Sequence, residues 1–251
     1  MDTRTTAEAT FRFYGPLNDF LPPELRQRPV RYAFHGRPGV KDPIEALGVP
    51  HVEVELIVVA KRPVPFRYRL RAGDRVAVYP AFTALEVGAR LRPPPPAAFV
   101  VDVHLHKLAR ILRLLGFDVS YHNPAMDRQL VDISSRQHRI LLTRDRELLK
   151  HGAVTHGYWV RSHHPPKQAR EVLRRFAIRD QARPFSRCLA CGGELVPVTK
   201  QEVNDRIPPK TAAWIDTYVR CRSCDKLYWP GTHFARLRRL VADVLGPERP
   251  T

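Results

Sequence analysis

All four cysteines of the 251-residue chain lie in one segment, as two Cys-x-x-Cys pairs. The first pair is Cys188 and Cys191, and the second is Cys221 and Cys224. Four thiolates from two such loops form a closed tetrahedral site for Zn²⁺, which serves folding and not catalysis. Two disulfides or a redox-active pair are the alternatives. We expect zinc, because no secretion signal favours disulfides and a redox pair needs no second Cys-x-x-Cys.

Three aspartates form a second group with possible chemistry. Asp102 ends a short apolar strand, Asp145 lies two residues beyond another, and Asp127 lies in the first turn of a helix that follows a third. The carboxyl ends of parallel strands meet at one edge of a sheet, so these side chains can converge there. Such hard oxygen ligands suit Mg²⁺ or Mn²⁺, which can activate water against a phosphodiester. The alternative for each aspartate is helix capping.

The charge of the chain favours a polyanionic partner. Lys and Arg total 42 against 25 Asp and Glu, a formal net charge of +17. Phosphate neutralisation by such charge drives nucleic-acid binding, although an arginine-rich proteome would give the same excess. The excess is greatest in residues 97–185, with 16 basic and 8 acidic residues. No apolar run approaches the roughly 20 residues of a membrane span, so we expect a cytoplasmic protein.

A basic stripe accompanies the aspartates. Lys107, Arg110 and Arg113 recur at helical spacing after Asp102, and Arg144 precedes Asp145. These four side chains are candidate contacts to an RNA backbone, and a solvated helix face is the alternative for the three on the helix.

The N-terminal part of the chain has the pattern of a small sheet with one helix. A run of four prolines, Pro93 to Pro96, predicts a stiff linker, so we assign residues 1–92 to one domain and 93–97 to the linker. The order of strand, strand, helix and further strands is that of an α+β β-grasp fold. We expect strands over residues 10–14, 30–34, 54–59, 66–70 and 75–79, and a helix over 40–48.

Strands alternate with helices after the linker, which predicts a parallel α/β sheet over residues 98–183. A zinc ribbon and a closing helix are expected over 184–251. The predicted strands of the α/β domain are 98–102, 117–121, 139–143 and 158–160, and its helices are 104–115, 165–176 and one that Asn123-Pro124 opens and that ends near 137. In the last segment we expect a strand over 217–220 and a helix over 234–245.

Several motifs give this stretch a family resemblance. They are Phe99-Val100-Val101-Asp102, Leu108-Ala109-Arg110, Leu114-Leu115-Gly116-Phe117-Asp118 and Ile140-Leu141-Leu142-Thr143-Arg144-Asp145, with Tyr228-Trp229 and His233 after the last cysteine. Together they resemble the mut-seven C-terminal RNase domain, a PIN-like family, over about residues 97–245. The resemblance implies a metal-dependent ribonuclease, with Asp102, Asp127 and Asp145 as ligands. Asp118 opens its strand and is expected to be structural. Asp132 and Glu147 are weaker candidates.

Residues 8–90 resemble the ubiquitin-like sulfur carriers, and in particular the ubiquitin-like domain found in front of this RNase family. Sulfur carriers end in a free Gly-Gly, whereas this domain runs into Val87-Gly88-Ala89 and the proline linker. We therefore expect a binding or positioning role, with a protein partner as one option, and no sulfur carriage.

The expected function is hydrolysis of RNA by a metal-dependent ribonuclease that contains structural zinc and catalytic Mg²⁺ or Mn²⁺. A non-catalytic RNA- or ribosome-binding protein with the same fold is the alternative, and a regulatory module acting through protein contacts is a third option. Trp229 and Tyr228 are expected to pack the ribbon against the α/β domain, although exposed rings there could stack on bases.

Overall fold

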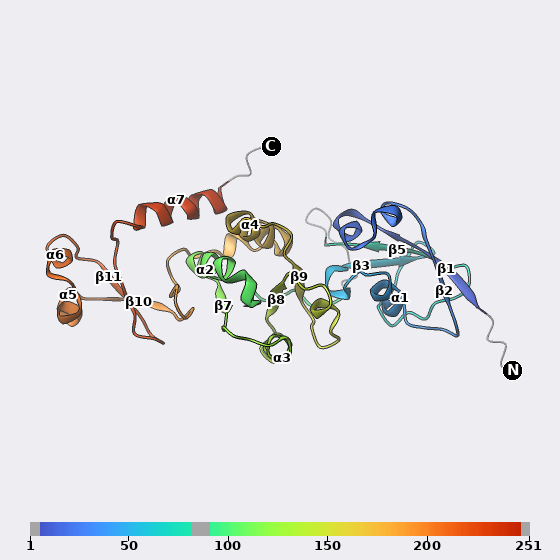
Figure 1. Ribbon diagram of the computed structural model, residues 1–251, viewed down its shortest axis with the longest axis horizontal. Helices are drawn as coiled ribbons and strands as arrows, with labels where there is room; N and C mark the ends of the chain where they lie inside the picture. Colours follow the sequence, from blue (N-terminus) through green and yellow to red (C-terminus); the bar gives the residue numbers. More distant parts are fainter. Residues whose placement is uncertain (1–5, 82–90, 247–251) are drawn as a thin grey trace. The chain divides into compact units, whose positions relative to one another are not determined.

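The computed structural model describes residues 6–81 and 91–246 (Figure 1). The chain divides into two compact units. Unit 1 comprises Met1–Pro95 together with Asp145–Trp159, and unit 2 comprises Pro96–Arg144 together with Val160–Thr251. The expected chain course through Val87, Gly88 and Ala89 lies outside the described residues. No helix in the described part of the chain is long and apolar enough to cross a membrane.

Unit 1 contains a five-stranded sheet of β-grasp type. Its strand order is β2-β1-β5-β3-β4, with β1 parallel to β5 in the centre and antiparallel pairs on both sides. The elements of this part are β1 (Ala7–Phe13), β2 (Val30–Phe34), α1 (Lys41–Ala46), β3 (Leu56–Val59), β4 (Arg62–Pro63) and β5 (Arg75–Tyr79), with the 3-10 helices η1 (Gly15–Phe20), η2 (Pro23–Leu25) and η3 (His51–Glu53).

The core of unit 1 lies on one face of this sheet. Alternate residues Phe11 and Phe13 of β1 are buried there, with Ile44 of α1 and Leu17 of η1 in the same cluster. The two-residue period of the strands therefore determines which of their side chains are buried in the core of the unit.

The predicted strand over residues 66–70 is wrong. The N–H of Tyr68 donates to the carbonyl of Pro65 (2.9 Å), which makes this stretch a turn, and Arg69 forms only an isolated bridge with Gly39. Phe66 and Leu70 still pack on the core. The apolar alternation therefore indicates contact with the core here, although the segment does not form a paired strand.

A later segment of the chain packs within unit 1. Residues 145–159 contain η5 (Leu148–Lys150) and β9 (Gly157–Trp159). His51 Nε2 lies 2.9 Å from the carbonyl of Val154, and a carboxylate oxygen of Glu53 accepts from the N–H of Trp159 at 2.8 Å. The guanidinium of Arg146 lies 4.1 Å from the centroid of the Trp159 ring.

The first part of unit 2 is a parallel α/β arrangement. Strand β6 lies between β7 and β8 and is parallel to both, with Val101 opposite Leu142 at the carboxyl end. The elements are β6 (Ala98–Val101), η4 (Val103–Leu105), α2 (His106–Leu114), β7 (Asp118–Ser120), α3 (Asp127–Arg136), β8 (Ile140–Thr143), α4 (Pro165–Phe176) and η6 (Arg179–Gln181).

Helix α3 begins later than the sequence predicts. Asn123-Pro124 was expected to open it, but Met126 is extended and the helix begins at Asp127. The N–H of Met126 donates to the side-chain oxygen of Gln129 (2.9 Å). The side chain of Gln129 therefore caps the start of the helix, in place of the expected asparagine.

The C-terminal part of unit 2 is a three-stranded antiparallel ribbon with short helices. The strand order is β10-β11-β12, and Tyr218, Val203 and Ile207 form its small core. The elements are β10 (Leu195–Val198), α5 (Lys200–Val203), η7 (Asn204–Arg206), α6 (Pro209–Ala212), β11 (Tyr218–Cys221), β12 (Leu227–Tyr228) and α7 (Phe234–Leu245).

Candidate functional site

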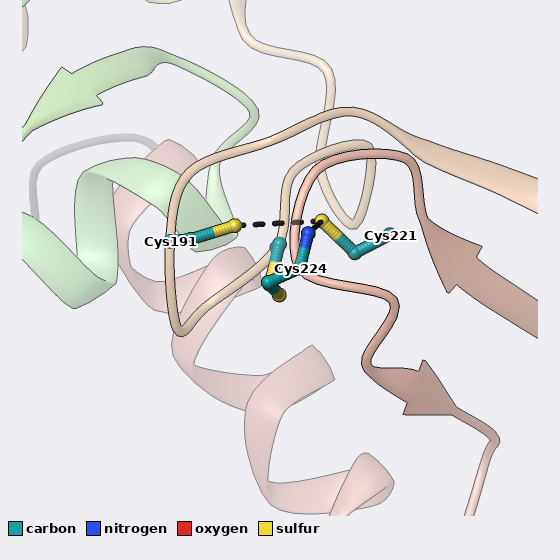
Figure 2. Close-up of side chains that lie close together, drawn as sticks. Cys191, Cys221 and Cys224 are labelled. Atoms are coloured by element: carbon teal, nitrogen blue, oxygen red, sulfur yellow. Dashed lines mark hydrogen bonds between the residues drawn. The ribbon is translucent and has the colours of Figure 1, made fainter.

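The four cysteines converge in the ribbon. Their Sγ atoms all lie within 4.8 Å of one another, with Cys188 and Cys224 at 3.6 Å and Cys191 and Cys221 at 3.4 Å. Figure 2 shows the Sγ atoms of Cys191 and Cys221 facing each other, with Cys224 beside them. Four sulfurs at ~2.3 Å from a tetrahedral ion lie ~3.8 Å apart, so this donor set fits a metal ion.

Backbone geometry aims the thiols of both loops. In the first loop, the N–H of Gly192 donates to the carbonyl of Cys188 (2.8 Å), and Gly192 has φ +84°. A Cβ on Gly193 would lie 2.9 Å from the Sγ of Cys221, so only glycine fits between the two loops. In the second loop, the N–H of Ser223 donates to that same Sγ (3.4 Å).

Tyr228 supports the thiolate of Cys188. The two side chains are 3.1 Å apart. Burial disfavours the thiolate, but the Tyr228 hydroxyl and nearby backbone N–H groups outweigh that effect and lower the pKa of Cys188 to about 6. Burial and the same contact raise the pKa of Tyr228. Tyr228 thus gives one sulfur of the cluster a polar contact from β12.

Trp229 packs within the ribbon itself, and another tryptophan is exposed. Trp229 contacts the small core of the ribbon, with its ring centroid 6.3 Å from that of Tyr218. Trp214, which follows α6, is 84% exposed. The sequence Thr-Ala-Ala-Trp gave no signal of this exposure, because its apolar residues suit a helix packed on a core.

Asp102 lies at the carboxyl end of β6, as the sequence predicts. It is buried, and its Oδ2 accepts from the hydroxyl of Thr143 at 2.6 Å. Its Oδ1 accepts from the N–H of His104 at 3.4 Å. The register of β6 and β8 brings Asp102 and Thr143 together, so the carboxylate has a fixed orientation.

Asp127 and Asp145 have different surroundings. Asp127 is the first residue of α3 and is exposed. Asp145 is also exposed, and its Oδ1 accepts from the N–H groups of Glu147 (2.7 Å) and Leu148 (3.3 Å). Within residues 6–81 and 91–246, the cysteines are the group of three or more potential metal ligands, and the three aspartates do not form such a group.

Asp118 is a structural residue, in agreement with its position at the start of β7. Its two carboxylate oxygens accept from the guanidinium of Arg139 at 2.9 and 3.1 Å. This bidentate pair fixes the strand end away from the carboxyl edge of the sheet.

The basic stripe on α2 is shorter than expected, because Arg113 does not belong to it. Lys107 and Arg110 are exposed, but Arg113 is only 4% exposed. Its guanidinium donates to the carbonyl of Val119 (3.0 Å) and to that of Ala190 (2.7 Å) in the first cysteine loop. Leu108, Leu112 and Leu115 occupy the buried side of the helix, and Arg113 shares that side. The Arg113 side chain is therefore an interior one, and Lys107 and Arg110 are the exposed members of the stripe.

Arg144 contacts His163 in the loop that precedes α4. Its guanidinium lies 3.0 Å from Nε2 of His163 and donates to the carbonyl of Ser162 at 3.2 Å. The side chain is thus held on the loop that leads into α4.

A parallel α/β domain with a four-cysteine ribbon, preceded by a β-grasp domain, is the class that the fold and the cysteine site define. The family model described as Mut7-C RNAse domain matches residues 97–241, and the one described as Mut7-C ubiquitin matches residues 6–86. The chain belongs to the Mut7-C RNAse domain family, which confirms the resemblance. No curated protein and no solved structure matches the chain.

Proposed function

We propose that this chain is a metal-dependent ribonuclease that hydrolyses RNA phosphodiester bonds. The match of residues 97–241 to the Mut7-C RNAse domain is the observation that carries the proposal. The oriented carboxylate of Asp102 at the carboxyl edge of the sheet supports it, because ligands of open α/β sheets bind at that edge.

Asp102, Asp127 and Asp145 are the proposed ligands of a catalytic Mg²⁺ or Mn²⁺. Carboxylate oxygens are the donors that these ions prefer, and such an ion supplies charge stabilisation and an activated water. Among the described residues, the three carboxylates do not form a common ligand group. What the chain itself supplies is the fixed Asp102 carboxylate and the exposed cations of Lys107 and Arg110, which suit a phosphate backbone.

The cysteine cluster is proposed to hold one structural Zn²⁺. Four sulfur ligands complete a tetrahedral site and leave no position for substrate, so its contribution is to the folding of the ribbon. The three-stranded ribbon has only a small core of its own, which agrees with a need for a metal.

The proposal is tested by cleavage of single-stranded and structured RNA by the full chain with added Mn²⁺ or Mg²⁺. Asp102→Asn and Asp145→Asn are expected to lower the cleavage rate by about 100-fold or more, because each removes a proposed carboxylate ligand of the metal ion that would stabilise the transition state. Asp180→Asn is the control, since Asp180 is exposed on η6, in the same unit as Asp102.

If the wild type cleaves RNA and both variants cleave it at the same rate, the aspartate site is refuted. RNA binding without cleavage in any metal would instead favour the non-catalytic RNA-binding alternative.

A further inference from the structure

The sheet of unit 1 has a second face that the core does not use. On this side, Arg31 of β2 and Arg75 of β5 lie on either side of Thr10 of β1, because both residues pair with Thr10. Arg12 lies two residues further along β1 on the same side. All three arginines are exposed. Strand spacing places the Cα atoms of Arg31 and Arg75 ~10 Å apart and that of Arg12 ~7 Å from Thr10.

Two tyrosines extend this surface at the end of β1. The rings of Tyr14 and Tyr79 are stacked with centroids 4.4 Å apart and planes at 9°, and the guanidinium of Arg12 lies 5.5 Å from the Tyr14 centroid. Both tyrosines are half-buried, and the alternation of the strands puts them on the side opposite Phe13 and Val78, which belong to the core. We call Arg12, Arg31, Arg75, Tyr14 and Tyr79 the outer face.

The charge of the outer face is predominantly positive. Glu8 is the acidic residue of the β1 strand on this side, and it pairs with Arg31 at 2.6 Å. Both partners are well exposed, with 78% of the Arg31 side chain and 42% of the Glu8 side chain accessible. Such a surface pair is weak and leaves the arginine able to exchange partners.

We propose that the outer face binds single-stranded RNA, with the arginines contacting phosphates and the tyrosines stacking on bases. Cations that follow a backbone beside stacking rings are the combination by which proteins hold single strands without sequence preference. This inference rests on the proposed function, because it takes the ligand to be the substrate of the RNase domain. It gives the β-grasp domain the role of holding that substrate.

The test measures binding of a fluorescein-labelled single-stranded RNA to the full chain by anisotropy, in buffer without Mg²⁺ or Mn²⁺. The combined Arg12→Ala, Arg31→Ala and Arg75→Ala variant is expected to bind at least 10-fold more weakly. Loss of three phosphate contacts should also lower the slope of log affinity against log salt by about 2.

The matched control removes the same charge from elsewhere in unit 1. Arg28, Arg62 and Arg67 are exposed, and Arg62 pairs with Val59, a residue of the buried face. Their combined replacement by alanine is expected to change the affinity less than 3-fold. Equal weakening by both triple variants, or none by either, would overturn the inference.

Stacking is tested separately at Tyr79. Tyr79→Leu is expected to weaken binding about 5-fold or more, whereas Tyr79→Phe keeps the ring and the affinity. Equal losses in both variants would overturn the stacking role. Competition by polyglutamate as effective as competition by unlabelled RNA would show that the face takes acidic protein, and would overturn the RNA assignment.

Cleavage measured in parallel separates this inference from the proposed function. If the wild type cleaves RNA and the outer-face variant binds it unchanged, the inference fails and the ribonuclease stands. If the wild type binds RNA through the outer face without cleaving it in any metal, the ribonuclease fails and the binding face stands.

Discussion

Arg113 illustrates how one side chain can be misassigned by its charge. Its spacing from Lys107 and Arg110 suggests a basic stripe, yet its guanidinium is buried against the carbonyls of Val119 and Ala190. Burial lowers the pKa of Arg113, and the nearby Cys191 and Cys188 thiols oppose that effect. The residue thereby ties the first cysteine loop to β7.

Arg113→Met is expected to lower the free energy of unfolding by about 2–4 kcal/mol, because two carbonyls lose their donor in a buried place. Denaturant unfolding followed by circular dichroism measures this. Arg110→Met is the matched comparison on the same helix, with an expected change within about 0.5 kcal/mol. Similar unfolding free energies for the two variants would contradict the structural role of Arg113.

At the scale of elements, the two cysteine loops show what glycine contributes to a metal site. Gly193→Ala places a methyl group 2.4 Å from the Oγ of Ser223 and 2.9 Å from the Sγ of Cys221, so one loop must move. We expect at least about 10-fold weaker zinc affinity, a loss typical of disturbed ligand support. Competition with a chromogenic chelator measures it.

Gly152→Ala serves as the control for that measurement, because no atom lies within 4 Å of the added methyl group. An unchanged zinc affinity in Gly193→Ala would show that the loops do not meet as described. Elemental analysis well below one zinc per chain in freshly purified, reduced wild type would refute the zinc assignment itself.

The elements also show how far the sequence predicts this protein. Strands β2 and β5 and helices α4 and α7 have the predicted bounds, because each combines a clear apolar period with a proline, glycine or polar boundary. The 66–70 prediction failed because Phe66 and Leu70 pack on the core from a turn, so the apolar alternation arises there without a strand.

Among the candidate site residues, the cysteines were predictable because two Cys-x-x-Cys loops have few other uses. The position of Asp102 was predictable from the strand that it ends. The hydrogen bond from the Thr143 hydroxyl to Asp102 was not predictable, because it depends on the register of β6 and β8. The burial of Arg113 depends on the distant Ala190 carbonyl, and helical spacing alone carries no such information.

At the scale of the whole molecule, acid is expected to weaken unit 1 through Glu45. Burial opposes ionisation of Glu45, but the hydrogen bond and charge of His51, with Lys41, lower the pKa of its carboxyl. A lowered folded-state pKa stabilises the unit above the ordinary carboxyl pKa of about 4.3, and this contribution is lost as pH falls through the lower folded value.

Glu45→Gln should therefore flatten the acid limb of the plot of unfolding free energy against pH, whereas Glu24→Gln, at an exposed position, should not. Denaturant unfolding at a series of pH values measures both. Parallel acid limbs for wild type and Glu45→Gln would contradict the assignment.

The packing of residues 145–159 bears on how freely the parts of this protein can be exchanged. The two family models follow one another along the chain, with a boundary between residues 86 and 97. The contacts cross that boundary, because the segment that begins at Asp145 forms hydrogen bonds with His51 and Glu53. The regions matched by the two family models therefore cannot be exchanged independently of each other. A transplanted RNase domain would leave behind the residues that hold the chain just after one of its proposed catalytic aspartates.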